Sequence, residues 1–203
     1  MTITDPIAAG IRRADHSDQR AVATTVAAAF FDDPVTCWLL PDVDERRQVI
    51  VPMFEVYIEP YLRNGDVFLT ANGEGAAVWL PPGRQLMTPQ EEASFGDALA
   101  ALAGEASERF GALDEIFAHY LLEVPLYYCQ FLATVPALQG RGIGGAFLRD
   151  QLQRADQEGM PAYHEATTLR NRALYERHGY VNQGEFTLPD GGPTLWRMWR
   201  DPR

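Results

Sequence analysis

The stretch that decides the fold is residues 134–148, which read TVPALQGRGIGGAFL. Four glycines, at positions 140, 142, 144 and 145, stand at the start of a segment that predicts a helix over 142–158. Glycine has no Cβ atom, so backbone N–H groups can converge uncovered at a helix start, where the helix dipole adds positive potential. The stretch therefore predicts an anion site that suits a pyrophosphate. The alternative interpretation is a glycine-rich turn without a ligand.

The same glycines also fit the dinucleotide fingerprint, as Gly140-x-Gly142-x-x-Gly145, with Glu165 placed where a ribose-binding acid is expected. In that fingerprint the first glycine closes the preceding strand, whereas here Pro136 ends the strand and residues 137–139 intervene. Too few residues follow Gly145 to build a second mononucleotide-binding half. A nucleotide-binding protein stays as an alternative interpretation.

The residues on either side of this stretch predict a mixed α/β chain. A strand is expected over 126–135, and beyond the glycine-led helix come a strand over 161–168 and a helix over 171–178. The segment 88–123 looks inserted, and Thr88 with Glu91 supplies a helix start there. The other expected elements are a strand at 11–13, helices at about 15–30 and 44–62, turns over 32–41, a hairpin of 66–70 with 76–80, one or two helices in 88–123, and closing strands at 181–188 and 194–199.

Composition limits the class of protein and of partner. The 203 residues carry 28 acidic and 17 basic side chains, for a net charge of -11, and 46% are apolar, which suits one domain with a single core. Every basic residue is arginine, so a Schiff-base lysine and the lysine of a P-loop are excluded. The acidic balance argues against a nucleic-acid partner and suits a cationic ligand.

Targeting and metal signals are absent from the sequence. The longest apolar stretch, Ala21–Phe31, is shorter than the roughly 20 residues of a membrane helix, and Met1–Gly10 lacks the positive charge of a secretory signal. Cys37 and Cys129 show no metal-ligand spacing, and Cys129 is expected in the core. We therefore expect a cytoplasmic protein without a membrane or metal site, and the sequence leaves a homodimer open.

Two motifs together resemble a known superfamily. Gln139-x-x-Gly142-x-Gly144 resembles the Gln/Arg-x-x-Gly-x-Gly/Ala signature of the GNAT superfamily of acetyl-CoA-dependent N-acetyltransferases. About 30 residues later, Glu165-Ala166-Thr167 and the stretch 171–180 resemble its second signature in order and spacing. The resemblance covers residues from about 126 to 200. It implies a mixed, twisted sheet of about six to seven strands with helices on both faces, within one domain over 1–203 that carries the insertion.

The resemblance also implies acetyl-CoA as co-substrate and a set of residues that bind it. The main chain at the splayed end of the central strand would pair with the pantetheine arm and polarise the thioester oxygen. The glycine-rich segment would hold the pyrophosphate, and Asn171 resembles the coenzyme-contacting asparagine, its alternative being a simple helix N-cap. The implied coenzyme residues are Leu132, Ala133, Thr134, Gln139, Gly140, Arg141, Gly142, Ile143, Gly144, Gly145 and Asn171.

Acetyl transfer from a thioester to an amine needs an acid and a base. Tyr175, at i, i+4 from Asn171 on the predicted helix, is the acid candidate, since a phenol can protonate the departing thiolate. The alternative is a core tyrosine that packs against Leu174 and Tyr180. Glu165, near the carboxyl end of its strand, is the base candidate, and its alternative is a solvated or Arg170-paired glutamate.

The acceptor pocket should be lined by the first two helices and the insertion. Suitable acidic and aromatic residues there are Asp32, Asp33, Trp38, Tyr57 and Tyr61, although the two tyrosines also fit a core stripe. Further candidates for the base are Glu55, Glu123 and His119. The sequence thus predicts direct acetyl transfer to a primary amine, with a small-molecule acceptor. The alternatives are a non-catalytic acyl-CoA sensor and the nucleotide-binding protein described above.

Overall fold

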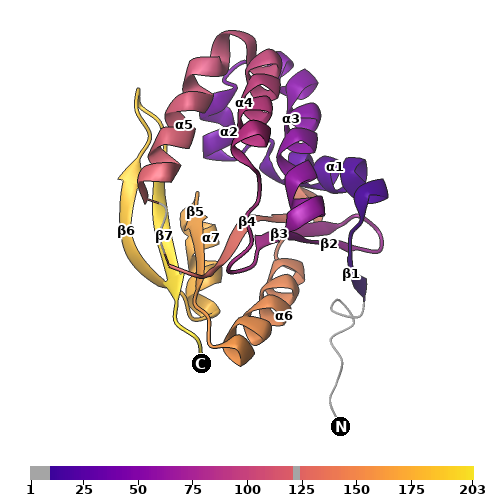
Figure 1. The fold of residues 1–203 in the computed structure, drawn as a ribbon, viewed down its shortest axis with the longest axis vertical. Coiled ribbons are helices and arrows are strands. Elements are labelled where there is room, and N and C mark those ends of the chain that lie inside the picture. Colours follow the sequence, from indigo (N-terminus) through magenta and orange to yellow (C-terminus); the bar gives the residue numbers. More distant parts are fainter. Residues whose placement is uncertain (1–9, 121–123) are drawn as a thin grey trace.

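The structure, a computed structural model shown in Figure 1, describes residues 10–120 and 124–203. Its strands are β1 Ile11–Arg13, β2 Asp66–Thr70, β3 Gly75–Leu80, β4 Tyr127–Thr134, β5 Ala162–Ala166, β6 Val181–Thr187 and β7 Thr194–Arg200. Its α-helices are α1 Gln19–Phe30, α2 Pro34–Leu39, α3 Val43–Asn64, α4 Pro89–Ala103, α5 Ser107–Tyr120, α6 Ile143–Glu158 and α7 Leu169–Arg177. Short 3₁₀ turns are η2 His16–Asp18, η3 Gly104–Ala106 and η4 Pro136–Leu138.

The described strands form one sheet in the order β1-β2-β3-β4-β5-β7-β6. Neighbouring strands pair antiparallel except β4 and β5, which pair in parallel. The expected mixed α/β sheet is thereby confirmed. A dinucleotide-binding fold has a mostly parallel sheet, and η4 separates β4 from the first glycine, so the nucleotide-binding interpretation does not match this fold.

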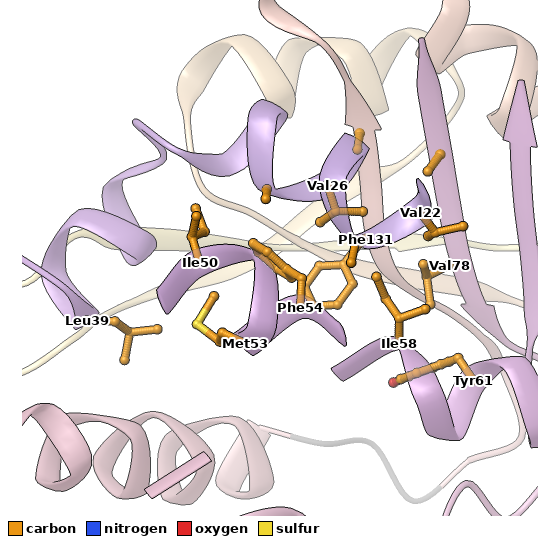
Figure 2. Packing of buried hydrophobic residues seen from close by; sticks show 14 of the residues in the cluster. Val22, Val26, Leu39, Ile50, Met53, Phe54, Ile58, Tyr61, Val78 and Phe131 are labelled. Carbon is orange, nitrogen blue, oxygen red and sulfur yellow. The ribbon is translucent and has the colours of Figure 1, made fainter. Parts of the chain in front are cut away.

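Helices cover both faces of the sheet, because apolar side chains alternate along its central strands. On one face Phe131 of β4 packs with Val26 of α1 and Phe54 of α3, with the Phe54 and Phe131 ring centroids 5.2 Å apart (Figure 2). On the other face Cys129 of β4 packs with Phe147 of α6. The first cluster packs α1 and α3 on one face of the sheet, and the second packs α6 on the other.

The start of α6 lies very close to the end of β3. A Cβ atom at Gly75 would lie 2.6 Å from Cγ2 of Ile143 and 3.1 Å from the Ala133 carbonyl oxygen, so no larger residue fits there without a shift. Gly75 therefore allows the first turn of α6 to reach the sheet beside β4. The position of the glycine-led helix start depends on this contact.

Two helix starts differ from the sequence prediction. The turns expected over 32–41 contain α2, which begins because Asp33 accepts a hydrogen bond from the Val35 N–H at 2.9 Å and Pro34 occupies the first turn. Asp-Pro suits a turn and a helix start equally well, so this prediction was wrong. Helix α7 begins at Leu169 with Thr168 as its N-cap, whereas Asn171 lies in the first turn and is not the cap.

The segment expected to be inserted forms α4 and α5. The predicted helix start at Thr88 is confirmed, and Thr88 and Glu91 form a capping box at the start of α4. Helix α4 packs on α3 and α5 packs on α4, and Figure 1 shows both standing beside α2 and α3 in the upper half of the view. Residue Glu123, a candidate for the base, lies outside the described residues.

Within residues 10–120 and 124–203, the structure contains no helix with the length and apolar character needed to cross a bilayer.

One buried carboxylate connects three parts of the chain. Asp66, at the start of β2, is fully buried and lies 2.6 Å from Nη2 of Arg13, 3.1 Å from Nη1 of Arg84 and 2.7 Å from Nη1 of Arg154. These arginines come from β1, from the segment after β3 and from α6. Asp66 therefore ties the edge of the sheet to α6 by charge-assisted hydrogen bonds.

We predict that Asp66→Asn lowers the free energy of unfolding by about 3 kcal/mol, because three guanidinium groups lose the carboxylate that they share. Urea unfolding measures this difference. The matched control is Asp44→Asn, which removes an exposed pair with Arg47 and should cost about 0.5 kcal/mol or less. Equal losses in the two variants would show that the cluster has no special role.

Candidate active site

The site begins where the two parallel strands diverge. Strands β4 and β5 pair at Tyr127 with Ala162 and at Tyr128 with Tyr163. Beyond these pairs β4 continues along β3 and β5 continues along β7, so both strands stay in the sheet without pairing to each other. Backbone polar groups on the facing edges of β4 and β5 are thereby available to a ligand.

A bulge in β4 lies at the same point. Trp79 of β3 is opposite Cys129, whereas Val78 is opposite Phe131, so Gln130 is an extra residue on β4. A bulge bends a strand and increases its twist. The segment Leu132–Thr134, predicted to be splayed, lies on the diverging part beyond this bulge.

The start of α6 lies beyond the end of β4 and carries no side-chain cap. Gly140 and Gly142 have left-handed backbones, with φ of +82° and +89°, and Gly142 is the N-cap residue. The first N–H groups of a helix have no partner within it. Since no described side chain caps this end, the N–H groups of the first turn can bind an anion.

Basic side chains surround this helix start, although the whole chain is acidic. Arg170 donates to Oε1 of Gln139 at 2.8 Å, and Nε2 of Gln139 donates to the Thr134 carbonyl oxygen at 3.2 Å. A Cβ atom on Gly140 would lie 3.9 Å from Nη2 of Arg170, and one on Gly145 would lie 3.4 Å from Nη1 of Arg149. Arginine charges and uncapped N–H groups together favour a phosphate-bearing ligand.

A cavity of about 300 Å³ opens beside the diverging strands. The elements that line it are α1, α2, α3, α4, α5, α7, β4, β5 and β7, which include the first two expected helices and the insertion. Among the described residues that line it there are carboxylates and no arginine. The aromatic lining residues are Phe30, Phe54, Tyr57, Tyr61, Phe95, Phe117, Tyr128, Phe131 and Tyr175, and the acidic ones are Asp33, Asp114 and Glu165.

Glu165 lies on β5 at this cavity and is 7% exposed. The Tyr128 hydroxyl donates to its Oε2 at 2.9 Å. Burial raises the pKa of Glu165 to about 7, because the charged form loses solvation. A solvated glutamate does not match this burial, and Arg170, the example of a paired arginine, donates to Gln139 instead. The carboxyl can therefore gain and lose a proton near neutral pH.

Tyr175 on α7 is buried at the same cavity, and Asn171, one turn earlier, also lines it. The Tyr175 ring lies 4.5 Å from the His164 ring and 5.6 Å from the Tyr180 ring, between centroids. Burial raises the pKa of Tyr175 well above its usual 10, so the phenol keeps its proton. The predicted packing against Tyr180 is present, and it coexists with a place in the cavity wall.

Sequence reasoning missed two polar groups of this cavity. His164 is buried, lines the cavity and places Nδ1 2.5 Å from the Cys129 carbonyl oxygen. Thr167 donates to Oδ2 of Asp33 at 2.5 Å, and burial raises the pKa of Asp33. A signal for both was present, because His164 and Thr167 flank Glu165 near the carboxyl end of its strand.

Several predicted pocket residues lie elsewhere. Asp32 is exposed, and Trp38 is buried with Nε1 donating to the Pro189 carbonyl oxygen at 3.1 Å, so neither lines the cavity. Glu55 pairs with Arg20 at 3.0 Å, outside the cavity.

Three other predictions concern aromatic groups and the cysteine. His119 is exposed on α5 and packs against the ring of Tyr120, away from the cavity. Tyr57 and Tyr61 belong to the core and the cavity wall at once. Cys129 is in the core, as predicted. Among residues 10–120 and 124–203, no group of three or more metal-ligating side chains is placed to hold a metal.

Comparison with known proteins agrees with this geometry. A family model described as an acetyltransferase (GNAT) domain matches residues 99–182, which contain β4, α6, β5 and α7. The chain is 28% identical over 188 residues to an uncharacterized N-acetyltransferase of Schizosaccharomyces pombe, covering 87% of this chain and 76% of that protein.

Solved structures share the fold over nearly the whole chain. A structure described as histone acetyltransferase HPA2 and related acetyltransferase, from Corynebacterium glutamicum, matches with a TM-score of 0.72 and 26% identity, covering 95% of this chain and 96% of that chain. Arylalkylamine N-acetyltransferase 2 from Aedes aegypti has the same fold, with a TM-score of 0.65 and 12% identity, covering 95% and 98% of the two chains.

The pKa of Glu165 makes stability depend on pH. The folded chain holds this proton up to about pH 7, whereas the unfolded chain releases it near pH 4.5. Between these values the folded state binds more protons, so the contribution of Glu165 to stability falls as pH rises. We predict that Glu165→Gln, relative to wild type, gains about 3 kcal/mol of unfolding free energy between pH 4.5 and 8. Urea unfolding at several pH values measures it, and a pH-independent difference would contradict the burial argument.

Proposed function

We propose that this chain, an N-acetyltransferase with the GNAT fold, transfers the acetyl group of acetyl-CoA directly to the primary amine of a small molecule. The observation that carries the proposal is the convergence of three features at one place. An uncapped helix start lies at the end of β4, the edge of β4 is free of β5, and a carboxylate-lined cavity opens beside both.

The coenzyme would bind to main-chain atoms. The first-turn N–H groups of α6, next to Arg149 and Arg170, would hold the diphosphate. The free edge of β4 over Leu132–Thr134 would pair with the pantetheine arm and polarise the thioester oxygen. Asn171, in the cavity wall, would contact the coenzyme. Ile143 is buried, so its part in this site would be limited to its backbone.

The reaction needs a neutral amine. Glu165, with a pKa near 7, would take the amine proton directly or through water while the nitrogen forms its bond to the acetyl carbon. As the carbon–sulfur bond breaks, Tyr175 would give its proton to the thiolate of coenzyme A. Exchange with solvent would then remove the proton from Glu165 and restore the one on Tyr175. Burial keeps the proton on Tyr175 at neutral pH, and it brings the pKa of Glu165 near 7, where the carboxyl can take up a proton and release it again.

The cavity indicates the class of acceptor. Aromatic rings from α1, α3, α4 and α5 surround it, while its acidic groups are Asp33, Asp114 and Glu165. Such a wall favours a cationic amine with an aromatic or apolar body. The chain also resembles puromycin N-acetyltransferase in its alanine-rich first helix and in 76–79, 125–128 and 194–196, so puromycin belongs among the amines to test.

We propose further that residues 1–203 form one N-acetyltransferase domain and that the insertion serves the acceptor side. Phe95 of α4 and Asp114 and Phe117 of α5 line the cavity, whereas the coenzyme residues come from β4, α6 and α7. The cytoplasmic location, the homodimer and the lack of a nucleic-acid partner remain predictions from the sequence. An acyl-CoA sensor would not need Tyr175 and Glu165 in one cavity, so the geometry favours the enzyme.

A screen tests the proposal. Purified protein is incubated with acetyl-CoA and a panel of aryl-alkyl amines, aliphatic diamines, amino acids and puromycin, and released thiol is measured. We expect release with aromatic or apolar amines and little with amino acids, whose carboxylates the acidic wall repels. Binding without release from any amine would favour the sensor. Thermal shift measurements with acetyl-CoA and with NAD test which of the two binds. A ligand present at 100 times its Kd raises the free energy of unfolding by about 2.7 kcal/mol.

We predict that Gly142→Val weakens acetyl-CoA binding by about 10-fold or more, because a branched side chain at φ +89° both strains the loop and covers the helix start. Titration calorimetry measures the affinity. The control is Gly159→Val, at the other end of α6, which has φ +66° and open space around it. It imposes similar backbone strain away from the site. An equal loss of acetyl-CoA affinity in both variants would therefore show that the coenzyme does not bind at the start of α6.

We predict that Tyr175→Phe lowers kcat by about 100-fold and leaves the Kd of acetyl-CoA unchanged, because only the proton donor is lost. Steady-state kinetics and calorimetry separate the two effects. Tyr180→Phe is the matched control, since its buried hydroxyl has no hydrogen-bond partner among the described residues and it packs on the same ring. Unchanged kcat in Tyr175→Phe would exclude the acid role.

A further inference from the structure

The proposed reaction assigns no role to His164, a buried residue of the cavity wall. His164 follows Tyr163, the last β5 residue that pairs with β4. Tyr127 donates its N–H to the Pro161 carbonyl oxygen at 2.8 Å, so its polar backbone groups face β5. Alternate residues of a strand face the same neighbour, and a continued parallel ladder would therefore give the Cys129 carbonyl oxygen a backbone donor from β5. In this structure the His164 side chain takes that place.

The imidazole makes two contacts at the point where β4 and β5 separate, which we call the fork. Nδ1 lies 2.5 Å from the Cys129 carbonyl oxygen, and the ring centroid lies 4.5 Å from that of Tyr175. A carbonyl oxygen only accepts, so Nδ1 carries a proton. Burial lowers the pKa of His164 to about 4, so the ring is neutral and Nε2 is unprotonated. One neutral tautomer therefore links β4, β5 and α7.

We infer that His164 is a positioning residue, whose Nδ1–H replaces the ladder donor to Cys129 and holds β4 and β5 apart. This inference rests on the proposed function for its kinetic consequence, and on geometry alone for its structural one. Without the side-chain donor, the Cys129 carbonyl oxygen would be left unpaired in the core or would pull a β5 backbone N–H toward it. Either change would narrow the gap between β4 and β5 or distort the edge of β4 to which the thioester would bind.

The alternative role for His164 is proton transfer through Nε2. A positioning residue needs only a donor at the place of Nδ1, whereas a base needs the ring. Asparagine carries an amide nitrogen that can occupy the place of Nδ1, and glutamine carries the same group one methylene farther along. His164→Asn and His164→Gln therefore form a matched pair that differs in where the donor lies.

Kinetics of this pair test the inference. We expect His164→Asn to keep kcat within about 5-fold of wild type and His164→Gln to lose about 10-fold or more, with the KM of the amine nearly constant in both. Near-ultraviolet circular dichroism of both variants establishes that the core is folded. If both variants lose activity equally, or neither does, the donor position has no effect and the inference is wrong. Wild-type protein without activity toward any amine would instead indicate failure of the proposed function.

A second measurement needs neither acetyl-CoA nor an amine. Long-range ¹H–¹⁵N correlation spectra of the free protein report which imidazole nitrogen carries the proton. We expect His164 to be neutral and protonated at Nδ1 throughout pH 6 to 8. A proton on Nε2, or a charged ring in this range, would overturn the hydrogen bond to Cys129 and with it the inference. His119, which is exposed, gives a reference signal in the same spectra.

Discussion

The end of pairing between β4 and β5 is the constraint on which the rest of the structure depends. Two residue pairs hold these strands in parallel, and beyond them each strand relies on its other neighbour. The bulge at Gln130 lies where the strands separate, and His164 occupies the fork. An ordinary continuous sheet would leave neither a free edge on β4 nor space for the cavity beside it.

Burial then sets the chemistry of the groups that meet at this fork. A carboxyl and a phenol are both moved toward their neutral forms, with the pKa of Glu165 near 7 and that of Tyr175 well above its usual value. The same low-polarity surroundings keep His164 uncharged. Around the start of α6 the electrostatics are opposite, because the uncapped N–H groups of its first turn lie near two exposed arginines, Arg149 of α6 and Arg170 of α7. The two regions therefore favour ligand groups of opposite charge, which is the arrangement that the proposed reaction requires.

Prediction from the sequence succeeded where the physical cause is local. Thr88 with Glu91 caps α4, the glycine-rich stretch leads into the start of α6 with Gly142 as its N-cap, and β2 and β3 form the expected hairpin. Errors arose where one local signal serves two structures. Asp33-Pro34 suits a turn and a helix start, and Asn171 suits an N-cap that Thr168 provides instead. Asp32 and Trp38 were placed in the acceptor pocket by residue type alone, and they do not line the cavity.

By itself the sequence determined the α/β order, the glycine-led start of α6 and the placement of Glu165 and Tyr175 near the ends of consecutive elements, because periodicity and backbone freedom are properties of neighbouring residues. Only the tertiary structure decided that Glu165 is buried with Tyr128, that His164 reaches Cys129, and that Asp66 gathers three arginines. Those partners are tens of residues apart in the chain. Their contacts, and the protonation states that follow, exist only after the strands have paired and excluded water.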